Sequence, residues 1–449
     1  MRRLFGTSGI RGIFGENLDA IFAIKLGYAI SRLLPKKVVI GWDCRTSSKI
    51  LSYSLASAIA SCNITVDMAG LVTTPALQTY VTYTERYDYG IMVTASHNPP
   101  QYNGFKVFLG SGLESYPDTE EKIEKALEEK VNIQWDSVGA IQHLPDKHVC
   151  KYYVDKVLEH YVNSSKWNVG VDLAGCASIF TIPYLLERLE VNSYYINDTL
   201  DPLFKLRPPE PRPDNLGKLQ QLVQSKKLDF GVAFDGDGDR AIFVDEKGIA
   251  WWGDATGILI GKYLVEIGET KYVVTPITST IATEIVIENV GGKVIRTKVG
   301  GKNIVKEMIN HNSVWGFEEN GGGIYGKHVY GRDGGITLVL ILRILKHYNK
   351  PLSRLLGELP KYHQVKDKVM IKDKRTAELL IKHLYNKFSK FKIDTTEGVK
   401  IFFKDDEWVL VRPSGTEPII RIFGESKSRK RAEEMVLEMK KEIYQFLDK

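Results

Sequence analysis

The sequence predicts a soluble protein of several α/β domains, a fold class that its length, its alternating elements and its loops all favour. A chain of 449 residues exceeds what one hydrophobic core usually supports, so we expect three or four domains. Short apolar runs alternate with helical patterns, which is typical of α/β units whose central strands are largely parallel. Loops rich in glycine or proline follow several of these runs, at the strand ends where open α/β sheets bind ligands.

The elements form three similar blocks and a different last one. Strand-like runs lie at residues 37–41, 64–71 and 89–93, then at 167–172 and 229–234, and again at 272–275. Helical patterns cover residues 47–61, 117–128 and 336–347. In the last block, a basic linker at 361–374 precedes a helix, the strands 399–403 and 408–411, and a terminal helix from Arg429. Two helices with hairpin-like strands predict a separate α+β domain at the C-terminal end.

Charge and cysteine content exclude several classes of protein. The formal net charge of +6 is small for this length and indicates neither a nucleic-acid-binding nor a membrane protein. The N-terminus runs into glycines rather than a long apolar stretch, and the longest apolar run, within 336–342, is too short to span a bilayer. The cysteines (Cys44, Cys62, Cys150 and Cys176) have neither zinc-site spacing nor the density of a disulfide scaffold. We therefore expect a protein of the reducing cytoplasm.

The first loop of interest, TASHNPPQYNGFKVF at residues 94–108, follows the apolar run 89–93. We interpret Ser96 as a nucleophile held in the open by the Asn-Pro-Pro break, with His97 and Lys106 as neighbouring proton carriers. The alternative is a turn in which the serine only satisfies backbone groups. The loop lacks the G-x-S-x-G pattern, so a hydrolase triad is not supported.

The second loop carries three aspartates at alternate positions, Asp235, Asp237 and Asp239, followed by Arg240. Carboxylates crowded in this way repel one another unless they hold a cation, and their oxygens suit Mg²⁺. An EF-hand needs glycine at the sixth position, where Arg240 stands, and strand-like runs rather than helices flank the loop. An acidic surface turn is the remaining alternative.

The third loop, residues 315–328, nearly spells a P-loop between Gly321 and Lys327, but His328 replaces the hydroxyl residue that should hold Mg²⁺. Nucleotide binding is therefore poorly supported. Glu318 and Asn320 have side chains that can hydrogen-bond a polyhydroxylated ligand. A glycine-rich hairpin with solvated acids stays open as the alternative.

The fourth loop lies at residues 412–421. A strand leads into a Ser-Gly-Thr turn whose hydroxyl and N–H groups can surround an anion, with an arginine on each side, and arginine suits multi-point phosphate recognition. The residues concerned are Arg412, Ser414, Gly415, Thr416 and Arg421. A well-capped hairpin with incidental arginines is the alternative.

Taken together, a nucleophilic hydroxyl, a cation site, a polyol-binding pair and a phosphate clamp describe phosphoryl transfer on a sugar. The motifs at 94–99, 235–240, 316–321 and 412–416, with FGTSGIRG at 5–12, resemble those of the α-D-phosphohexomutases. This family contains phosphoglucomutase, phosphomannomutase and phosphoglucosamine mutase. The motifs occur in the family's order and span nearly the whole chain.

The resemblance implies three related α/β domains and a C-terminal α+β phosphate-binding domain around a central cleft. We place the domains at 1–147, with the phosphoserine loop; 148–247, with the metal-binding loop; 248–362, with the sugar-binding loop; and 363–449. The expected partners are small phosphosugars, with no nucleic acid and no membrane, and a homodimer is left open.

The resemblance also implies residue roles. Ser96 would carry a phosphate, and Asp235, Asp237 and Asp239 would hold Mg²⁺ against it. Arg11 and Arg240 would stabilise the transferring phosphate, Lys106 would serve in proton transfer, the fourth loop with Arg421 would hold the unreactive phosphate, and Glu318 with Asn320 would grip the sugar. The reaction would interconvert hexose 6-phosphate and hexose 1-phosphate through a bound hexose 1,6-bisphosphate.

Two positions depart from the family pattern. A histidine that bacterial members often carry aligns with Gly301, so we expect Lys302 to serve instead. Asn320 stands where the family has a serine, which leaves the sugar open among glucose, mannose and glucosamine. A phosphoglucosamine mutase of narrow specificity is an alternative, and a P-loop sugar kinase or a non-catalytic sugar-phosphate sensor are further ones.

Overall fold

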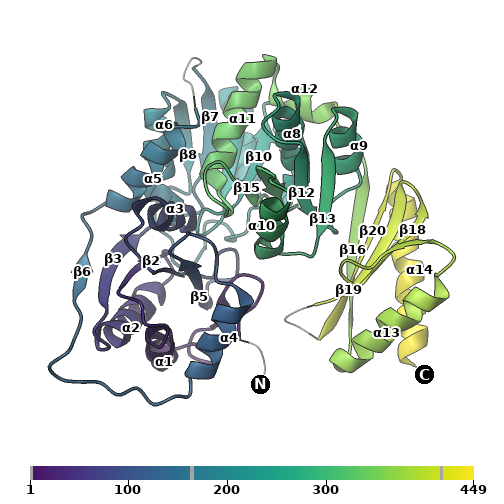
Figure 1. Cartoon of the computed structure of the whole chain (residues 1–449). Coiled ribbons are helices and arrows are strands. Elements are labelled where there is room, and N and C mark those ends of the chain that lie inside the picture. Colours follow the sequence, from purple (N-terminus) through teal and green to yellow (C-terminus); the bar gives the residue numbers. More distant parts are fainter. Residues whose placement is uncertain (1–3, 162–165, 415–417, 449) are drawn as a thin grey trace. The chain divides into compact units, whose positions relative to one another are not determined.

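The computed structural model describes residues 4–161, 166–414 and 418–448 (Figure 1). Two compact units are formed, each from two separate stretches of the chain. The first unit combines Met1–Ile260 with Asn320–Gly357, and the second combines Gly261–Glu319 with Glu358–Lys449. Helix α8 (Gly253–Glu266) contains one of the boundaries between them.

The first unit begins with a six-stranded sheet in the order β1-β5-β4-β2-β3-β6. The strands are β1 (Ile10–Ile13), β2 (Lys37–Trp42), β3 (Thr65–Leu71), β4 (Tyr89–Val93), β5 (Tyr102–Leu109) and β6 (Ile141–His143), and the helices are α1 (Ala20–Ser31), α2 (Ser48–Ala60), α3 (Thr74–Thr84) and α4 (Pro117–Ala126). Strand β2 runs parallel to β3 and β4, whereas β5 is antiparallel to β4 and β1. Val38 and Ile40 alternate along β2 on the face that shares a buried core with α1 and α2.

A second sheet of the first unit has the order β11-β10-β9-β7-β8. Its strands are β7 (Asn168–Asp172), β8 (Asn192–Ile196), β9 (Phe230–Phe234), β10 (Ala241–Asp245) and β11 (Ala250–Trp251). The other elements here are α5 (His148–Leu158), η1 (Ala177–Phe180), α6 (Ile182–Arg188), η2 (Pro213–Asn215), α7 (Gly217–Lys226), β15 (Gly323–Tyr325), α11 (Gly334–Tyr348) and α12 (Leu352–Gly357). Strand β7 is parallel to β8 and β9, and β9 turns back into β10 as an antiparallel hairpin. The hairpin presents the acidic loop between its strands.

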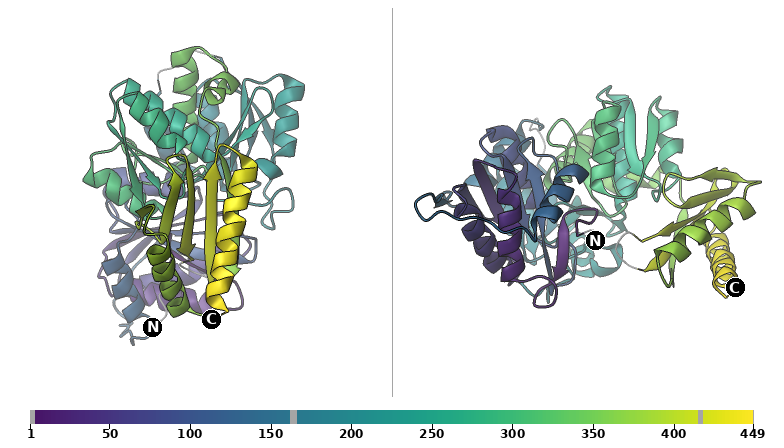
Figure 2. Two further views of the ribbon diagram at one scale, coloured as in Figure 1. Left: turned by 90° about the vertical axis from the view of Figure 1, so that its right-hand side faces the viewer. Right: turned by 60° about the horizontal axis from the view of Figure 1, so that its bottom comes forward.

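The second unit contains a parallel arrangement in which β12 (Tyr272–Pro276) pairs with β13 (Lys293–Thr297) and β14 (Trp315–Phe317). Helices α9 (Ala282–Asn289) and α10 (Gly301–Asn310) connect these strands. The chain then forms an antiparallel sheet in the order β16-β20-β19-β18-β17. Its elements are β16 (His363–Met370), α13 (Lys374–Lys387), β17 (Lys392–Asp394), β18 (Val399–Lys404), β19 (Glu407–Pro413), β20 (Ile419–Ser426) and α14 (Arg429–Leu447). Both α13 and α14 contribute buried side chains to one core on this sheet (Figure 2).

The α/β class, the parallel central strands and the α+β character of the last block are confirmed. The predicted strands correspond to β2, β3, β4, β7, β9, β12, β18 and β19, and the predicted helices to α2, α4, α11, α13 and α14. The basic linker expected at 361–374 is wrong, because most of it is strand β16, which pairs with β20 along its whole length. Charged residues are common on edge strands, where they oppose further strand pairing, and they conceal the alternation of this one.

Within the described part of the chain, no helix combines the length and the apolar character that crossing a membrane requires.

Candidate active site

The candidate nucleophile lies in a turn after β4 in which Ser96 adopts the left-handed backbone conformation, with φ of 52°. A non-glycine residue in this region of φ and ψ is uncommon and needs support from its surroundings. The Ser96 N–H donates to Thr94 Oγ1 at 2.8 Å, and the Ser96 hydroxyl donates to Asp235 Oδ2 at 2.7 Å. Ser96 is 0 % exposed, so the expectation of a serine in the open is wrong. The acidic loop covers its hydroxyl.

The acidic loop requires its glycines because it approaches the serine turn closely. A Cβ on Gly236 would lie 2.7 Å from the Ser96 carbonyl oxygen, and Gly238 has φ of +75°. The three aspartates that alternate with these glycines are buried, and each offers an oxygen within 4.8 Å of the other two. The loop therefore gathers three carboxylates beside the serine hydroxyl, as the sequence predicts.

Buried cations balance these carboxylates. Lys106 Nζ donates to Asp237 Oδ2 at 2.7 Å and to Asp239 Oδ2 at 2.8 Å. Arg332 Nη2 donates to Asp239 Oδ2 at 2.9 Å. Burial would lower the pKa of Lys106, but the two carboxylates outweigh it and raise that pKa above its ordinary value. Lys106 is thus a cation that faces the aspartates.

The aspartates do not have the same electrostatic surroundings. Burial, with the negative charges of Asp237 and Asp239, raises the pKa of Asp235 well above its usual range. Burial also disfavours ionisation of Asp239, but Arg332 and Lys106 override this effect and hold its pKa below the usual range. The serine-facing carboxyl of Asp235 is therefore the one that most needs a further cation in order to ionise.

The acidic loop fits a metal ion. Asp237 Oδ1 and Asp239 Oδ1 are buried and have no hydrogen-bond partner among the described residues, although such oxygens normally have one. Two unpartnered oxygens and the destabilised Asp235 carboxyl are the donor set that a small divalent cation with oxygen ligands requires. The buried cluster Asp235, Asp237 and Asp239 can hold a metal ion.

Two of the predicted phosphate-stabilising arginines lie at this site. Arg11, on β1, donates to Asn98 Oδ1 at 2.6 Å, and burial lowers its pKa to about 10, with Arg332 the next cause. Arg240 is 3 % exposed, donates through its N–H to Asp235 Oδ1 at 3.2 Å and through Nη1 to Glu210 at 3.0 Å. The site therefore gathers fixed positive charge around the serine turn.

His97 is adjacent to the nucleophile, and its Nδ1 lies 3.3 Å from Ser96 Oγ. Burial lowers the pKa of His97 well below its ordinary value, and Arg240 and Arg11 act in the same direction. The imidazole is therefore neutral at pH 7, and one ring nitrogen is able to accept a proton.

Sequence reasoning missed three residues that contact this site. Thr74 donates through Oγ1 to Asp237 and through its N–H to the Asp237 carbonyl at 2.9 Å. Arg332 pairs with Asp239, and Arg45 donates to the Ser96 carbonyl at 2.7 Å. Arg45 and Arg332 stand in the polar, glycine-flanked stretches 41–48 and 331–335, which carry no motif that would single them out.

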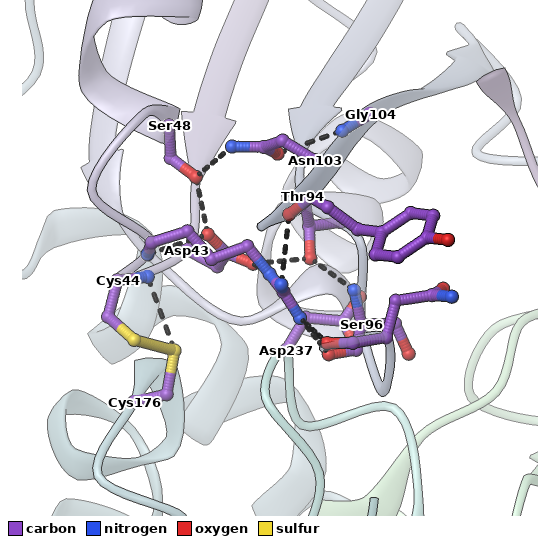
Figure 3. A network of polar contacts seen from close by, with 12 residues as sticks. Asp43, Cys44, Ser48, Thr94, Ser96, Asn103, Gly104, Cys176 and Asp237 are labelled. Carbon is purple, nitrogen blue, oxygen red and sulfur yellow. Dashed lines mark hydrogen bonds and ion pairs between the residues drawn. A yellow bond between two sulfur atoms is a disulfide. The ribbon is translucent and has the colours of Figure 1, made fainter. Parts of the chain in front are cut away.

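A disulfide joins Cys44, directly after Asp43, to Cys176 (Figure 3). The Cα atoms lie 5.2 Å apart, 132 residues apart in sequence, and the Cys44 N–H donates to Cys176 Sγ at 3.2 Å. The cysteine spacing predicted no such pair, and this prediction is wrong. The spacing of the cysteines contains no sign of a bond between two separate sheets.

The remaining candidate residues divide between the two units. Asn320 belongs to the first unit, and its Oδ1 accepts from the Gly322 N–H at 3.1 Å. Glu318 belongs to the second unit, where it follows β14 and is 5 % exposed. Lys302 lies in the first turn of α10 and is partly exposed. The stretch that resembles a P-loop contains strand β15 instead of the loop and helix that a P-loop needs, which argues against nucleotide binding.

The predicted phosphate clamp lies on β19 and β20 in the second unit. Arg412 and Arg421 are directly opposite one another on these antiparallel strands. Glu397 accepts from Arg412 Nη1 at 3.3 Å and from the Val299 N–H at 2.8 Å. Burial lowers the pKa of Arg412, although the Glu397 carboxylate opposes this effect. The Ser414 N–H donates to the Ile419 carbonyl at 2.9 Å. The predicted clamp residues Gly415 and Thr416 lie outside the described residues.

Four family models match the chain, and together they cover most of it. Their descriptions are phosphoglucomutase/phosphomannomutase alpha/beta/alpha domain I for residues 2–134, domain II for 151–248, domain III for 252–362, and the C-terminal domain for 364–442. These matches define the class of the enzyme as an intramolecular phosphotransferase.

Relatives and a solved structure agree with these matches. A phosphoglucomutase/phosphomannomutase of Thermococcus kodakarensis is 38% identical over 448 residues, which cover 97% of each chain. A phosphoglucosamine/phosphogalactosamine mutase of Sulfurisphaera tokodaii is 38% identical over 454 residues, which cover 98% of this chain and 99% of the relative. The crystal structure of a phosphoglucomutase/phosphomannomutase family protein of Burkholderia thailandensis is similar to this chain, with a TM-score of 0.86 at 23% identity. The similarity covers 100% of this chain and 97% of the chain in that structure, and it supports the fold. The chain belongs to the phosphoglucomutase/phosphomannomutase family, the α-D-phosphohexomutases, and is a phosphomutase of the isomerase class.

Proposed function

We propose that this phosphohexomutase interconverts hexose 6-phosphate and hexose 1-phosphate by passing a phosphoryl group through Ser96. The observation that carries the proposal is the contact of 2.7 Å from the Ser96 hydroxyl to Asp235, inside a cluster of three buried carboxylates. A serine hydroxyl beside a cation site, with Arg11 and Arg240 near it, suits a reaction that depends on positioning and charge neutralisation.

In the forward transfer, a sugar hydroxyl oxygen bonds to the phosphorus on Ser96 while the bond from phosphorus to Ser96 Oγ breaks. The hydroxyl proton passes to a carrier and then to Ser96 Oγ. His97 is the better carrier, because it is neutral and lies 3.3 Å from that oxygen. Lys106 keeps its proton, and its positive charge offsets the negative charges of Asp237 and Asp239.

Asp235, Asp237 and Asp239 would hold Mg²⁺ together with the phosphate of Ser96. Bound there, the ion would neutralise charge on the transferring phosphoryl oxygens. The protein's own part is to keep three carboxylates within reach of one another and to supply Arg11, whose guanidinium stays protonated at pH 7 despite its lowered pKa.

Most recognition groups of the proposed mechanism belong to the second unit, whereas Asn320 belongs to the first. Arg412 and Arg421 would anchor the phosphate that does not react, with Ser414, Gly415 and Thr416, since two arginines opposite one another on paired strands can engage several phosphate oxygens. Glu318, Asn320 and Lys302 would contact the sugar. The bound hexose 1,6-bisphosphate reverses its orientation between the two transfers and then returns its other phosphate to Ser96. We retain the boundaries 147/148, 247/248 and 362/363 for the four domains.

We propose that glucose, mannose and glucosamine phosphates are all substrates, because one set of contacts must accept the sugar in two orientations. A single polar contact changes discrimination by about 1–3 kcal/mol unless it leaves a buried group unpaired. Narrow phosphoglucosamine mutase activity is the second candidate, and the relatives named as phosphoglucosamine mutases favour it. Coupled assays with the three 6-phosphates separate them, since turnover of glucosamine 6-phosphate alone would support the narrow reading.

The decisive experiment is intact mass analysis of the purified protein, followed by peptide mapping. We expect one phosphate, on Ser96, and exchange of an isotopically labelled Ser96 phosphate into the sugar phosphates when a hexose monophosphate is added. Ser96→Ala should abolish turnover while hexose phosphate still binds. The two alternatives give other results, because a P-loop kinase would need nucleotide and a non-catalytic sensor would carry no phosphate. Turnover by unphosphorylated Ser96→Ala near the wild-type rate would refute the mechanism.

A further inference from the structure

Arg45 holds the serine turn through its backbone, and this contact is not part of the transfer step proposed above. Arg45 lies in the loop between β2 and α2 and is 2 % exposed. Nη2 donates to the carbonyls of Ser96 at 2.7 Å and Asn98 at 2.6 Å. Nη1 donates to the carbonyls of Pro99 at 2.7 Å and Tyr102 at 2.9 Å. One side chain therefore binds four carbonyl groups of a single irregular segment.

The fifth N–H group of Arg45 connects the turn to Asp43. Nε donates to Asp43 Oδ2 at 3.1 Å, so all five guanidinium N–H groups have an acceptor. The same Asp43 oxygen accepts from Thr94 Oγ1 at 2.7 Å, and Thr94 Oγ1 in turn accepts from the Ser96 N–H (Figure 3). Asp43 and Arg45 thus fix both the N–H and the C=O of Ser96.

This grip addresses a particular physical difficulty. A buried irregular turn has carbonyl groups that neither a helix nor a sheet satisfies, and each one left unpaired destabilises the fold. Ser96 also needs its left-handed φ of 52° to direct its hydroxyl at Asp235. A lysine at position 45 has three donors on a flexible stem instead of five in a planar fork.

We propose that Arg45, with Asp43 and Thr94, is a positioning group that sets the place of Ser96 Oγ for phosphoryl transfer. None of the three touches the reacting atoms; they act through the backbone of the turn. The proposal rests on the proposed function of Ser96. Because a reacting group displaced by about 1 Å loses on the order of a hundredfold in rate, a looser turn should slow transfer without weakening substrate binding.

The test is single-turnover transfer from phosphorylated enzyme to hexose 6-phosphate, followed by mass analysis of Ser96 after rapid quenching. We expect Arg45→Lys to lower the transfer rate and kcat about a hundredfold, with KM within about threefold, because its contacts are to the turn and not to the predicted substrate-binding residues. Wild-type protein is measured first: absence of phosphate on Ser96 would refute the proposed function, whereas phosphate on Ser96 with unimpaired transfer in Arg45→Lys would refute only the positioning role.

Arg296 provides a matched control in the second unit. Its five N–H groups also bind one carboxylate and the backbone of one loop, with acceptors on Glu284, Pro276, Ser279 and Thr280. Arg296→Lys should therefore disturb the fold in the same way but leave transfer within about twofold of wild type. An equal loss in both variants would show that general loosening suffices, and would overturn the proposal.

If Arg45→Lys does not fold, Thr94→Val tests the same positioning role. Valine preserves the shape of threonine but removes the oxygen between Asp43 and the Ser96 N–H. A fall in transfer of at least tenfold at unchanged KM supports the proposal, and a rate within threefold of wild type contradicts it.

Discussion

Reduction of the Cys44–Cys176 disulfide should destabilise the first unit substantially. The bond closes a loop across 132 residues, and cross-linking a chain over that separation removes about 17 cal/mol/K of unfolded-state entropy, or about 5 kcal/mol at 25 °C. Measured disulfides often contribute less than this chain-entropy value, so we expect a loss of about 3–5 kcal/mol. For a unit of this size each kcal/mol shifts the unfolding midpoint by about 2 °C, which predicts a fall of about 6–10 °C.

The assay is thermal unfolding with and without a dithiol reductant. The reductant converts the protein disulfide to two thiols and is itself oxidised. The double variant Cys44→Ser/Cys176→Ser should melt at the reduced midpoint and no longer respond to reductant. Cys62→Ser, a change at a free and partly exposed cysteine, should still respond like wild type. Native protein should titrate two thiols when denatured without reductant, from Cys62 and Cys150. Four titratable thiols, or equal midpoints with and without reductant, would refute the reasoning.

Three further predictions concern the acidic loop, the paired arginines of β19 and β20, and Lys400, a buried residue of β18 whose Nζ donates to the Ile277 carbonyl at 2.9 Å. Chelation with EDTA should stop turnover and added Mg²⁺ restore it, and Asp237→Asn should cut kcat by at least a hundredfold; full activity in chelator would contradict a metal role. Arg421→Ala should raise KM for both the 1-phosphate and the 6-phosphate, because loss of a charge-assisted contact costs about 1.5–3 kcal/mol, and an effect in one direction only would mean that the two orientations use different anchors. Burial lowers the pKa of Lys400 to about 7, so the unfolded chain binds one more proton between about pH 7 and the ordinary lysine pKa, and stability falls as pH drops through that window. Lys400→Met should flatten this slope by up to about 1.4 kcal/mol per pH unit in denaturant titrations, whereas Lys392→Met, at an exposed site, should not.

The sequence predicted those features of the site that lie in short local patterns. Asp235, Asp237 and Asp239 alternate with glycines, and their gathering follows from the tight hairpin that such a pattern forms. Ser96 was located by its motif, but its burial was not predicted, because the loop that covers it lies more than a hundred residues further along the chain.

Other features depend on long-range contacts that no local pattern encodes. Arg45 binds backbone carbonyls, which every residue has, so nothing in the sequence of its targets reveals the contact. Arg332 and the pair of Cys44 with Cys176 are likewise brought to the site by packing between distant segments. The strand β16 was missed for a different reason, since its edge position tolerates charged side chains that hide the period of two.

The burial of Ser96 has a consequence for the phosphorylated form of the enzyme that the proposed mechanism requires. The hydroxyl that donates to Asp235 loses its hydrogen when it is esterified, and a dianionic group then replaces a donor facing a carboxyl. The contact seen here therefore exists only in the dephosphorylated chain, and the turn with its acidic neighbour must take up a second local arrangement once phosphate is attached. We therefore expect phosphorylated and dephosphorylated protein to differ in hydrogen-exchange protection, with the difference confined to the serine turn and the β9–β10 hairpin. The covalent phosphate would then be a structural component of the resting enzyme as well as its chemical reserve.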